Sequence, residues 1–446
     1  MQSSGSKRAL SAASIGNFGE IYDFAVFGFS VPFIAAHFFP TGDTAAALLN
    51  TFAVYAVAFV ARPVGGLLFG YLLDRIGRVK VLSITIWLMA AGTAIIGLLP
   101  TYANIGLGAP LLLVICRFAQ GLAMGGELTG STSFILESAP SARRGRWVGF
   151  SYCLANIPNA LVALMLLGFQ LVIGKETYLD WAWRVPFLIG GLIGVVGYWL
   201  RRNLEDPDEY KEASRRNRTK SPLGILTRSG LRSMMYVAMI MPIQSVAAYL
   251  LLGFMYTFLV KQVGMDSTTA LLSNSVGIAA YAFFYLIGGT LSDRFGRKPV
   301  LMAGASWLVV VAYFSVRLAA NGSLVGAVTG QVLLGIGIGL YGAACSVAAA
   351  ELFPTSFRAT GHAIAYQVTV AVMGGTTPLV SAVLIKFLHS PLAPGWYVTI
   401  VAATTLILVQ FVPETKDVDL RTSIDGQTTD LHARELSSNA AGRPRS

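Results

Sequence analysis

Four ionisable side chains interrupt long apolar runs of this sequence and are the first candidates for chemistry. Glu20 and Asp23 share one run, Arg62 lies in the next, and Arg117 lies in a later one. A charge at the centre of a membrane-spanning helix costs at least about 2.5 kcal/mol, so it is usually paired or lines a wet cavity. Such residues are functional candidates by default.

The acids are spaced for proton chemistry. Glu20 and Asp23 lie on one face of a helix, about 60° apart, so both can face one cavity. Two carboxyl groups this close disfavour the doubly ionised state, which suits a group that must bind and release a proton. The alternative is static pairing with Arg62 or Arg117, and the two arrangements can occur in different conformations. Glu127, which follows two glycines, is a third candidate for proton or substrate contact, with hydrogen bonding between helices as its alternative.

The arginines are suited to anion binding. Arg62 precedes Asp74 by 12 residues, about 18 Å along a helix, which places it near the middle of a membrane. A planar guanidinium can hold a carboxylate through two parallel hydrogen bonds in a dry cavity. Arg62 and Arg117 are therefore candidates to anchor a substrate carboxylate, with structural pairing to the acids of the first run as the alternative.

Uncharged polar side chains within the apolar runs can orient a substrate or hold helices together. They include Tyr22, Tyr55, Gln120, Tyr152, Asn156, Asn159, Gln244, Tyr249 and Tyr341. From this set, substrate contact is predicted for Tyr22, Gln120, Tyr152 and Asn156. No catalytic residue, metal site or cofactor site is predicted, because no nucleophile–base pair is visible, the histidines do not cluster, and the cysteines lie singly within apolar runs.

Composition indicates the elements that must position these residues. The chain has 446 residues, of which 54% are hydrophobic and 12% charged, and its mean hydropathy is +0.63. That is too little polar surface for a soluble core, and apolar runs of about 20 residues can each cross a bilayer. Twelve such runs predict an all-α membrane protein, with spans near 15–38, 48–73, 81–99, 109–136, 147–173, 182–200, 233–260, 269–291, 299–316, 324–350, 360–385 and 396–412.

Two landmarks recur at nearly the same offset and indicate a duplicated chain. A charged turn over 70–80 returns over 289–298, with Asp293 lying 219 residues after Asp74. Glu351 lies 214 residues after Glu137. Parallel repeats of about six spans are a known plan of secondary transporters. The predicted divisions are a first half over 1–200, a central loop over 201–232, a second half over 233–412 and a disordered cytoplasmic tail over 413–446.

The repeated charges are predicted to form a cytoplasmic gate. A carboxylate at the end of one helix can meet guanidinium groups or a helix N-terminus of the other half. The alternative is that these charges only mark the membrane edge. The residues assigned to the gate are Asp74, Arg75, Arg78, Glu137, Arg144, Asp293, Arg294, Arg297, Glu351 and Arg358.

The basic residues predict the orientation. With both termini in the cytoplasm, 26 Lys and Arg residues fall on the cytoplasmic side and only four, Lys175, Lys261, Arg317 and Lys386, on the other. This asymmetry follows the positive-inside rule. The net charge of +11 is therefore mainly a topology signal, and nucleic-acid binding is not implied. A monomer is expected.

The repeated turn over 70–80 and 289–298 resembles the signature loop of the major facilitator superfamily. Four further segments resemble its metabolite:proton symporter family, which includes carriers of α-ketoglutarate, citrate, shikimate and proline/betaine. They lie at 16–24, 62–66, 117–127 and 180–187. Ile21 departs from the pattern, because family members commonly have an aromatic residue there.

The resemblance implies twelve helices in two pseudo-symmetric halves around a central cavity. It also implies a proton-driven importer of a small organic acid, such as a di- or tricarboxylate. A proline/betaine-type symporter is the alternative. A drug exporter of the same fold would resemble a G-x-x-x-G-P pattern in the fifth span, and 149–166 lacks it. A receptor of the same fold is disfavoured because neither tail is long enough for a signalling domain.

Overall fold

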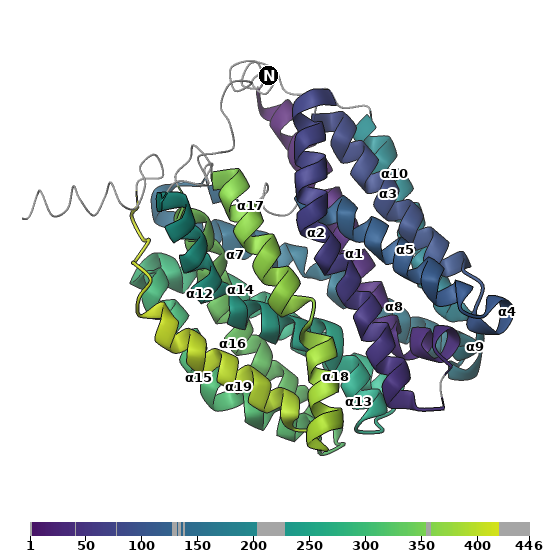
Figure 1. Ribbon diagram of the computed structural model, residues 1–446. Coiled ribbons are helices and arrows are strands. Elements are labelled where there is room, and N and C mark those ends of the chain that lie inside the picture. The colour runs from purple at the N-terminus through teal and green to yellow at the C-terminus, as the bar shows by residue number, and fades with distance from the viewer. Residues whose placement is uncertain are drawn as a thin grey trace, which may run out of the picture.

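The computed structural model describes residues 2–40, 42–76, 78–126, 132, 135–136, 139–202, 228–353 and 358–418. Some side chains within these ranges are not described, including those of 2–17 and 73–80. Throughout the described residues the regular structure is helical, and no strand occurs (Figure 1). We call the described residues up to 202 the N-half and those from 228 onward the C-half.

The N-half contains six apolar helical stretches, two of them accompanied by short helices. Its helices are α1 (Gln2–Phe38), α2 (Thr44–Ile76), α3 (Arg78–Leu98), α4 (Tyr102–Ile105), α5 (Gly108–Ala123), α7 (Arg144–Ala155), α8 (Ile157–Ile173), α9 (Lys175–Asp180) and α10 (Val185–Arg202). The fifth stretch breaks at Asn156, between α7 and α8. Pro158 begins the new helix, where its missing N–H costs nothing because the first turn has no partner for it.

The C-half repeats this plan with two interruptions. Its helices are α12 (Arg228–Tyr249), α13 (Met255–Lys261), α14 (Ser267–Phe295), α15 (Arg297–Ala319), α16 (Leu324–Glu351), α17 (Arg358–Thr369), α18 (Thr377–Leu388) and α19 (Ala393–Val409). A π-helical turn over Leu250–Phe254 joins α12 to α13, and another over Val370–Gly374 follows α17. Such turns widen the helix locally and are frequent at functional sites.

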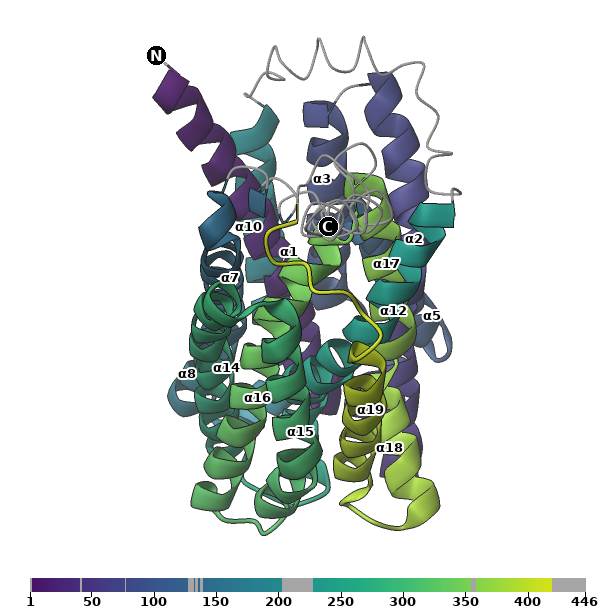
Figure 2. The ribbon, with the colours of Figure 1, turned by 90° about the vertical axis from the view of Figure 1, so that its left-hand side faces the viewer.

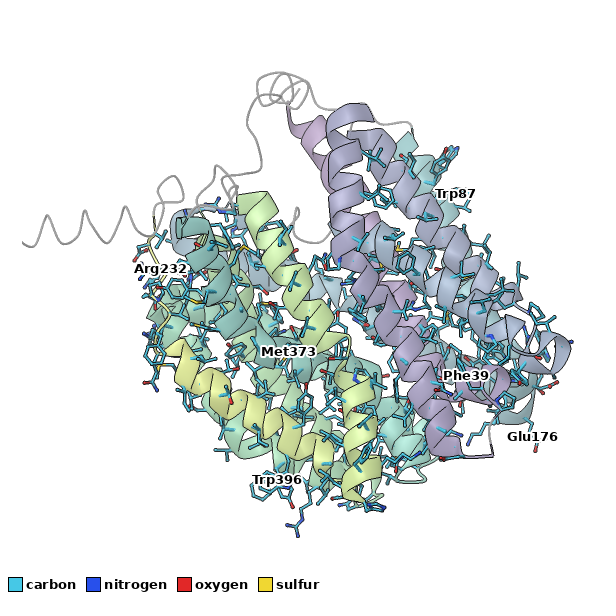
Figure 3. All side chains as sticks on the ribbon, in the orientation of Figure 1. Phe39, Trp87, Glu176, Arg232, Met373 and Trp396 are labelled. Carbon is cyan, nitrogen blue, oxygen red and sulfur yellow. The ribbon has the colours of Figure 1, made fainter. Side chains whose placement is uncertain are left out.

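The expected membrane spans are present in the predicted order. Within the described part of the chain, nine stretches are long and apolar enough to cross a membrane, and three shorter apolar helices cover 83–98, 108–123 and 393–409. The twelve-helix prediction is confirmed, with most ends within about five residues. The fourth span differs most, because α5 ends at Ala123 and a 3-10 turn follows over Met124–Gly126. Trp87 and Trp396 point outward from the bundle and are more than half exposed (Figure 3).

Glycines bring α2 and α5 into backbone contact, which positions the two buried arginines. A Cβ added to Gly121 would lie 2.1 Å from the carbonyl oxygen of Ala58, and one on Gly125 would lie 2.4 Å from that of Arg62. Side chains at these positions would push the helices apart. The small-xxx-small pattern of Gly121 and Gly125 therefore sets the approach of the helices that carry Arg62 and Arg117.

The two halves pack along several helix pairs. Helix α14 runs beside α7 and α8, while α2 packs on α18 and on the π-helical turn at Val370–Gly374 (Figures 1 and 2). At the crossing of α7 and α14, a Cβ on Gly289 would come within 2.3 Å of the Gly145 carbonyl oxygen. The contact between halves is thus a backbone contact at this end of the bundle. We call this end of the bundle the Asp293 end, because Asp293 lies there, and we call the opposite end, where Asp43 lies, the Asp43 end.

Candidate functional site

A first ion pair joins α1 to α2 inside the bundle. Arg62 Nη2 lies 3.4 Å from Glu20 Oε1, and both side chains are about 4% exposed or less. The Arg62 guanidinium carbon lies 4.4 Å from the centre of the Phe24 ring and 4.7 Å from that of Phe59. Aromatic faces attract a cation at this distance, and the attraction strengthens where water is excluded. Arg62 is therefore held by one carboxylate and two rings.

A second ion pair lies one helical turn away and has a fuller set of partners. Arg117 Nη1 lies 3.4 Å from Asp23 Oδ2. Asp23 Oδ1 accepts hydrogen bonds from Gln120 Nε2 at 2.7 Å and from the Thr93 hydroxyl. Gln120 Oε1 in turn accepts from Arg117 Nη1 at 3.0 Å. The network gathers side chains from α1, α3 and α5, and Thr93 is a member that the sequence did not single out.

The two acids are thus divided between two arginines. Glu20 faces Arg62 and Asp23 faces Arg117, so each carboxylate has its own counter-charge. This arrangement matches the static pairing considered as the alternative for these acids. Their role in proton coupling remains a prediction.

Both arginines keep donor capacity after these contacts. Among the described residues, Arg62 Nε and Arg117 Nε and Nη2 find no hydrogen-bond acceptor. The Arg117 guanidinium carbon lies 4.2 Å from the centre of the Phe27 ring and 5.6 Å from that of Tyr55. Burying an unsatisfied donor is costly. An anion that approached either guanidinium would find donors ready for it.

The other predicted substrate contacts bond mainly within the protein. Tyr22 donates its hydroxyl to the Pro186 carbonyl at 2.8 Å. Asn156 Nδ2 donates to the Tyr152 carbonyl at 2.8 Å. The Tyr152 ring stacks on Tyr285 of the C-half at a centroid distance of 5.0 Å. Their contact with substrate stays a prediction, and Glu127 lies outside the described residues.

Buried amides of the C-half face the same interface. Gln244 Nε2 donates to the Tyr281 hydroxyl at 3.4 Å, and Gln367 Nε2 donates across the halves to the Gly125 carbonyl at 3.5 Å. In the described part of the chain, the Oε1 atoms of both glutamines have no donor. Gln367 was missed because a single glutamine in an apolar run carries no spacing signal.

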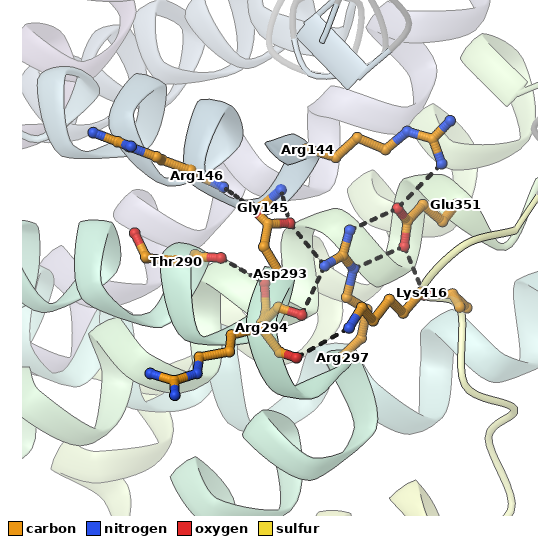
Figure 4. Close-up of polar contacts among 12 residues, drawn as sticks. Arg144, Gly145, Arg146, Thr290, Asp293, Arg294, Arg297, Glu351 and Lys416 are labelled. Atoms are coloured by element: carbon orange, nitrogen blue, oxygen red, sulfur yellow. Dashed lines mark hydrogen bonds and ion pairs between the residues drawn. The ribbon is translucent and has the colours of Figure 1, made fainter. Parts of the chain in front are cut away.

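The Asp293 end holds a separate charged cluster that joins the halves (Figure 4). Asp293 Oδ1 accepts from the Gly145 amide and Oδ2 from the Arg146 amide, both at 2.7 Å. These amides belong to the first turn of α7, where free N–H groups and the helix dipole favour an anion. Asp293 also pairs with Arg297 at 2.9 Å. The carboxylate therefore binds a helix N-terminus of one half and a guanidinium of the other.

Glu351 anchors the inner part of this cluster. Arg297 donates to it through Nε at 3.1 Å and Nη2 at 3.0 Å, a two-point contact. Arg144 of the N-half lies 3.7 Å from the same carboxylate. Arg358 is buried nearby, and its Nε donates to the carbonyls of Ala350 and Phe353.

The remaining predicted gate residues do not all join the cluster. Arg294 stacks over Phe295 at 5.2 Å and points away from Asp293 (Figure 4). The side chains of Asp74, Arg75, Arg78 and Glu137 lie outside the described residues.

The first residues of the predicted tail, as far as Val418, contact this cluster. Glu414 accepts from the backbone amides of Arg297 at 2.8 Å and Lys298 at 3.0 Å, which caps α15. Thr415 donates to Glu351 at 2.7 Å. The Val418 carbonyl accepts from Arg144 at 3.1 Å. The first amides of a helix have no partner within the helix, and only the fold brings this polar segment beside those of α15.

Comparison with known proteins agrees with this geometry. The chain matches the model of the Major Facilitator Superfamily over residues 13–280 and that of the Sugar (and other) transporter family over 201–423. It is 31% identical over 444 residues to a proline/betaine transporter of Escherichia coli (strain K12), covering 96% of this chain and 88% of that protein. It is 33% identical over 420 residues to a citrate-proton symporter of Klebsiella pneumoniae, covering 93% and 94%.

A solved structure shows the same fold. The proton:xylose symporter XylE superposes with a TM-score of 0.72 at 21% identity, covering 94% of this chain and 98% of that chain. The family models and the relatives together make the protein a multi-pass membrane transporter and not an enzyme. The chain therefore belongs to the Major Facilitator Superfamily.

Proposed function

We propose that this transporter is a proton-coupled importer of a small organic acid, such as a di- or tricarboxylate, working by alternating access. The observation that carries the proposal is the pair of buried acid–arginine contacts, Glu20–Arg62 and Asp23–Arg117. Each contact places a carboxylate that can take up a proton beside a guanidinium that can bind an anion.

The coupling step follows from the charge of Arg62. A guanidinium does not deprotonate in a protein, so it needs an anionic partner in every conformation. Glu20 serves when the site is empty. When a substrate carboxylate binds the guanidinium, Glu20 is released and takes up one proton, which balances the charge of that one carboxylate; each further ionised carboxylate of the substrate needs a further proton or cationic partner. Return of that proton on the other side restores the Glu20–Arg62 pair.

The gate and the orientation complete the proposal. The halves 1–200 and 233–412 would rock about the central site, and the contact of Asp293 with the first turn of α7 would break when the Asp293 end opens. The basic residues favour an orientation with this end and both termini in the cytoplasm, and the bacterial relatives and the family resemblance support a location in a bacterial inner membrane. The transporter is proposed to act as a monomer, with substrate and H⁺ as its ligands within the lipid bilayer.

A proline/betaine-type substrate is the second candidate, and one observation favours it. Both arginines are already neutralised, so the two pairs carry no net charge and suit a zwitterion as well as an anion. Aromatic rings such as Phe24 and Phe59 can also bind a quaternary ammonium group. The similarity to a proline/betaine transporter supports the same candidate.

Uptake by proteoliposomes tests both candidates. Purified protein would be offered citrate, α-ketoglutarate, succinate, shikimate and betaine under an imposed inward pH gradient without sodium. Accumulation of an acid supports the first candidate, and accumulation of betaine alone supports the second. Strict dependence on sodium, with no response to pH, would rule out proton coupling.

A further inference from the structure

Two exposed ion pairs join the halves at the Asp43 end. Asp43, just before α2, binds Lys386 in the last turn of α18 at 3.1 Å. Asp266, just before α14, binds Lys175 at the start of α9. In each pair one partner belongs to the N-half and the other to the C-half. Both pairs therefore break whenever the halves separate at this end.

The two pairs are copies of one contact under the internal repeat. Asp266 follows Asp43 by 223 residues and Lys386 follows Lys175 by 211. These offsets bracket those of the repeated landmarks at the other end, which are 219 and 214. In both copies an aspartate from the first connection of one half meets a lysine at the end of the fifth span of the other half, Lys386 in the last turn of α18 and Lys175 two residues after α8. An interface with two-fold symmetry pairs residues in this way, because each contact from the first half to the second is repeated from the second half to the first.

Each aspartate is fixed in place by its own helix. Asp43 Oδ1 accepts from the Ala45 amide at 2.8 Å and leaves Oδ2 for Lys386. Asp266 Oδ2 accepts from the amides of Thr268 and Thr269 and leaves Oδ1 for Lys175. The lysine hydrogen bond, together with the weaker hydrogen bonds from each aspartate's own helix, lowers the pKa of Asp266 to about 2 and that of Asp43 below its ordinary value. Both carboxylates are thus charged near neutral pH.

Exposure suits these pairs to repeated opening. All four side chains are between 44% and 56% exposed. Exposed charges regain water when they separate, so breaking each pair costs little. A further hydrogen bond joins the halves next to the second pair. Ser267 donates to Gln170 of the N-half at 2.7 Å and shares a hydrogen bond with Tyr256 at 2.8 Å.

We propose that Asp43–Lys386 and Asp266–Lys175 form a symmetric latch that holds the Asp43 end closed and opens once in each transport cycle. The latch opposes the Asp293 contact with α7 at the other end, so the balance between the two sets which end is open. The inference does not depend on the substrate or on proton coupling.

The test measures separation of the halves directly. Spin labels at Glu176 and Gln262, exposed positions on opposite sides of the second pair, report that separation by pulsed electron resonance (Glu176 is labelled in Figure 3). The full chain in nanodiscs would carry Lys175→Gln with Lys386→Gln, which remove the latch charges without touching the helix caps. Two exposed ion pairs predict a rise of about two- to thirty-fold in the ratio of separated to closed molecules.

Matched variants make the result decisive. Asp43→Asn with Asp266→Asn keeps a capping oxygen and should produce the same shift. Asp180→Asn with Arg317→Gln removes one exposed charge of each sign from the same end but from neither pair, and should leave the distances unchanged. If the lysine variants match the wild type, or if the control shifts equally, the latch is refuted. Because no substrate is used, failure of the proposed transport function would leave this result unaffected.

Discussion

At the scale of single residues, the setting of Arg62 makes one substitution informative. The guanidinium is held by Glu20 and two aromatic rings, and its Nε has no acceptor in the described part of the chain. Arg62→Lys keeps the charge but loses the planar fork. We expect substrate affinity to fall at least about tenfold, which corresponds to about 1.4 kcal/mol.

Binding on purified, folded protein separates this expectation from a structural role. Arg184→Lys is the matched control, because Arg184 also lies over an aromatic ring, Trp183 at 4.6 Å, but outside the charged pairs. A purely structural Arg62 would lower thermal stability in the lysine variant while the folded molecules kept their affinity. That outcome would exclude Arg62 as the substrate anchor.

The acids of α1 should differ in the effect of neutralisation. Glu20→Gln disturbs one ion pair, whereas Asp23→Asn turns one of two oxygens that each accept hydrogen bonds into an NH2 group, which then opposes either Arg117 or the donors Gln120 and Thr93. We therefore expect Asp23→Asn to lower thermal stability more. At least one variant should lose uphill uptake under a pH gradient while retaining substrate exchange. Full uphill uptake by both would move the proton site elsewhere.

At the scale of elements, the sequence predicted the helices well and their partners less well. Span positions followed from apolar length alone. Gly121 and Gly125 are spaced for a close helix contact, but only the fold shows that the partner helix is α2. Arg62 and Arg117 stood out because a charge in an apolar run is rare. Thr93 and Gln367 did not, because threonine and glutamine are common in such runs and acquire partners only through tertiary packing.

The ends of the elements were harder to predict for a related reason. Glu414 and Lys386 look like ordinary polar residues beyond a span. The first caps α15 from more than a hundred residues away, and the second reaches a loop of the other half. Sequence spacing reports on one helix at a time, so a contact between two ends remains invisible until the fold places them together.

At the scale of the whole molecule, the two ends of the bundle are closed by different physics. The Asp43 end uses two exposed ion pairs. The Asp293 end uses a carboxylate on a helix N-terminus, close backbone packing and the approach of Arg144 to the buried Glu351 carboxylate. Hydrogen bonds to a charged acceptor are each worth about 1.5–3 kcal/mol. The contacts at the Asp293 end should therefore contribute more to the free-energy difference between molecules open at one end and molecules open at the other.

Asp293→Asn tests that unequal balance. The substitution removes the charge that faces the first turn of α7 and turns one acceptor into a donor that opposes the Arg146 amide. We expect the ratio of molecules open at the Asp293 end to rise about tenfold or more. Spin labels at Ala142 and Arg294, both exposed at this end, would measure the separation after replacement of Cys153. Asp417→Asn, an exposed acid outside the contact, is the control.

Combining Asp293→Asn with Lys175→Gln and Lys386→Gln should restore part of the original balance, because each change favours the opening of an opposite end. An Asp293→Asn distance distribution equal to that of the control would show that the carboxylate does not hold the halves together.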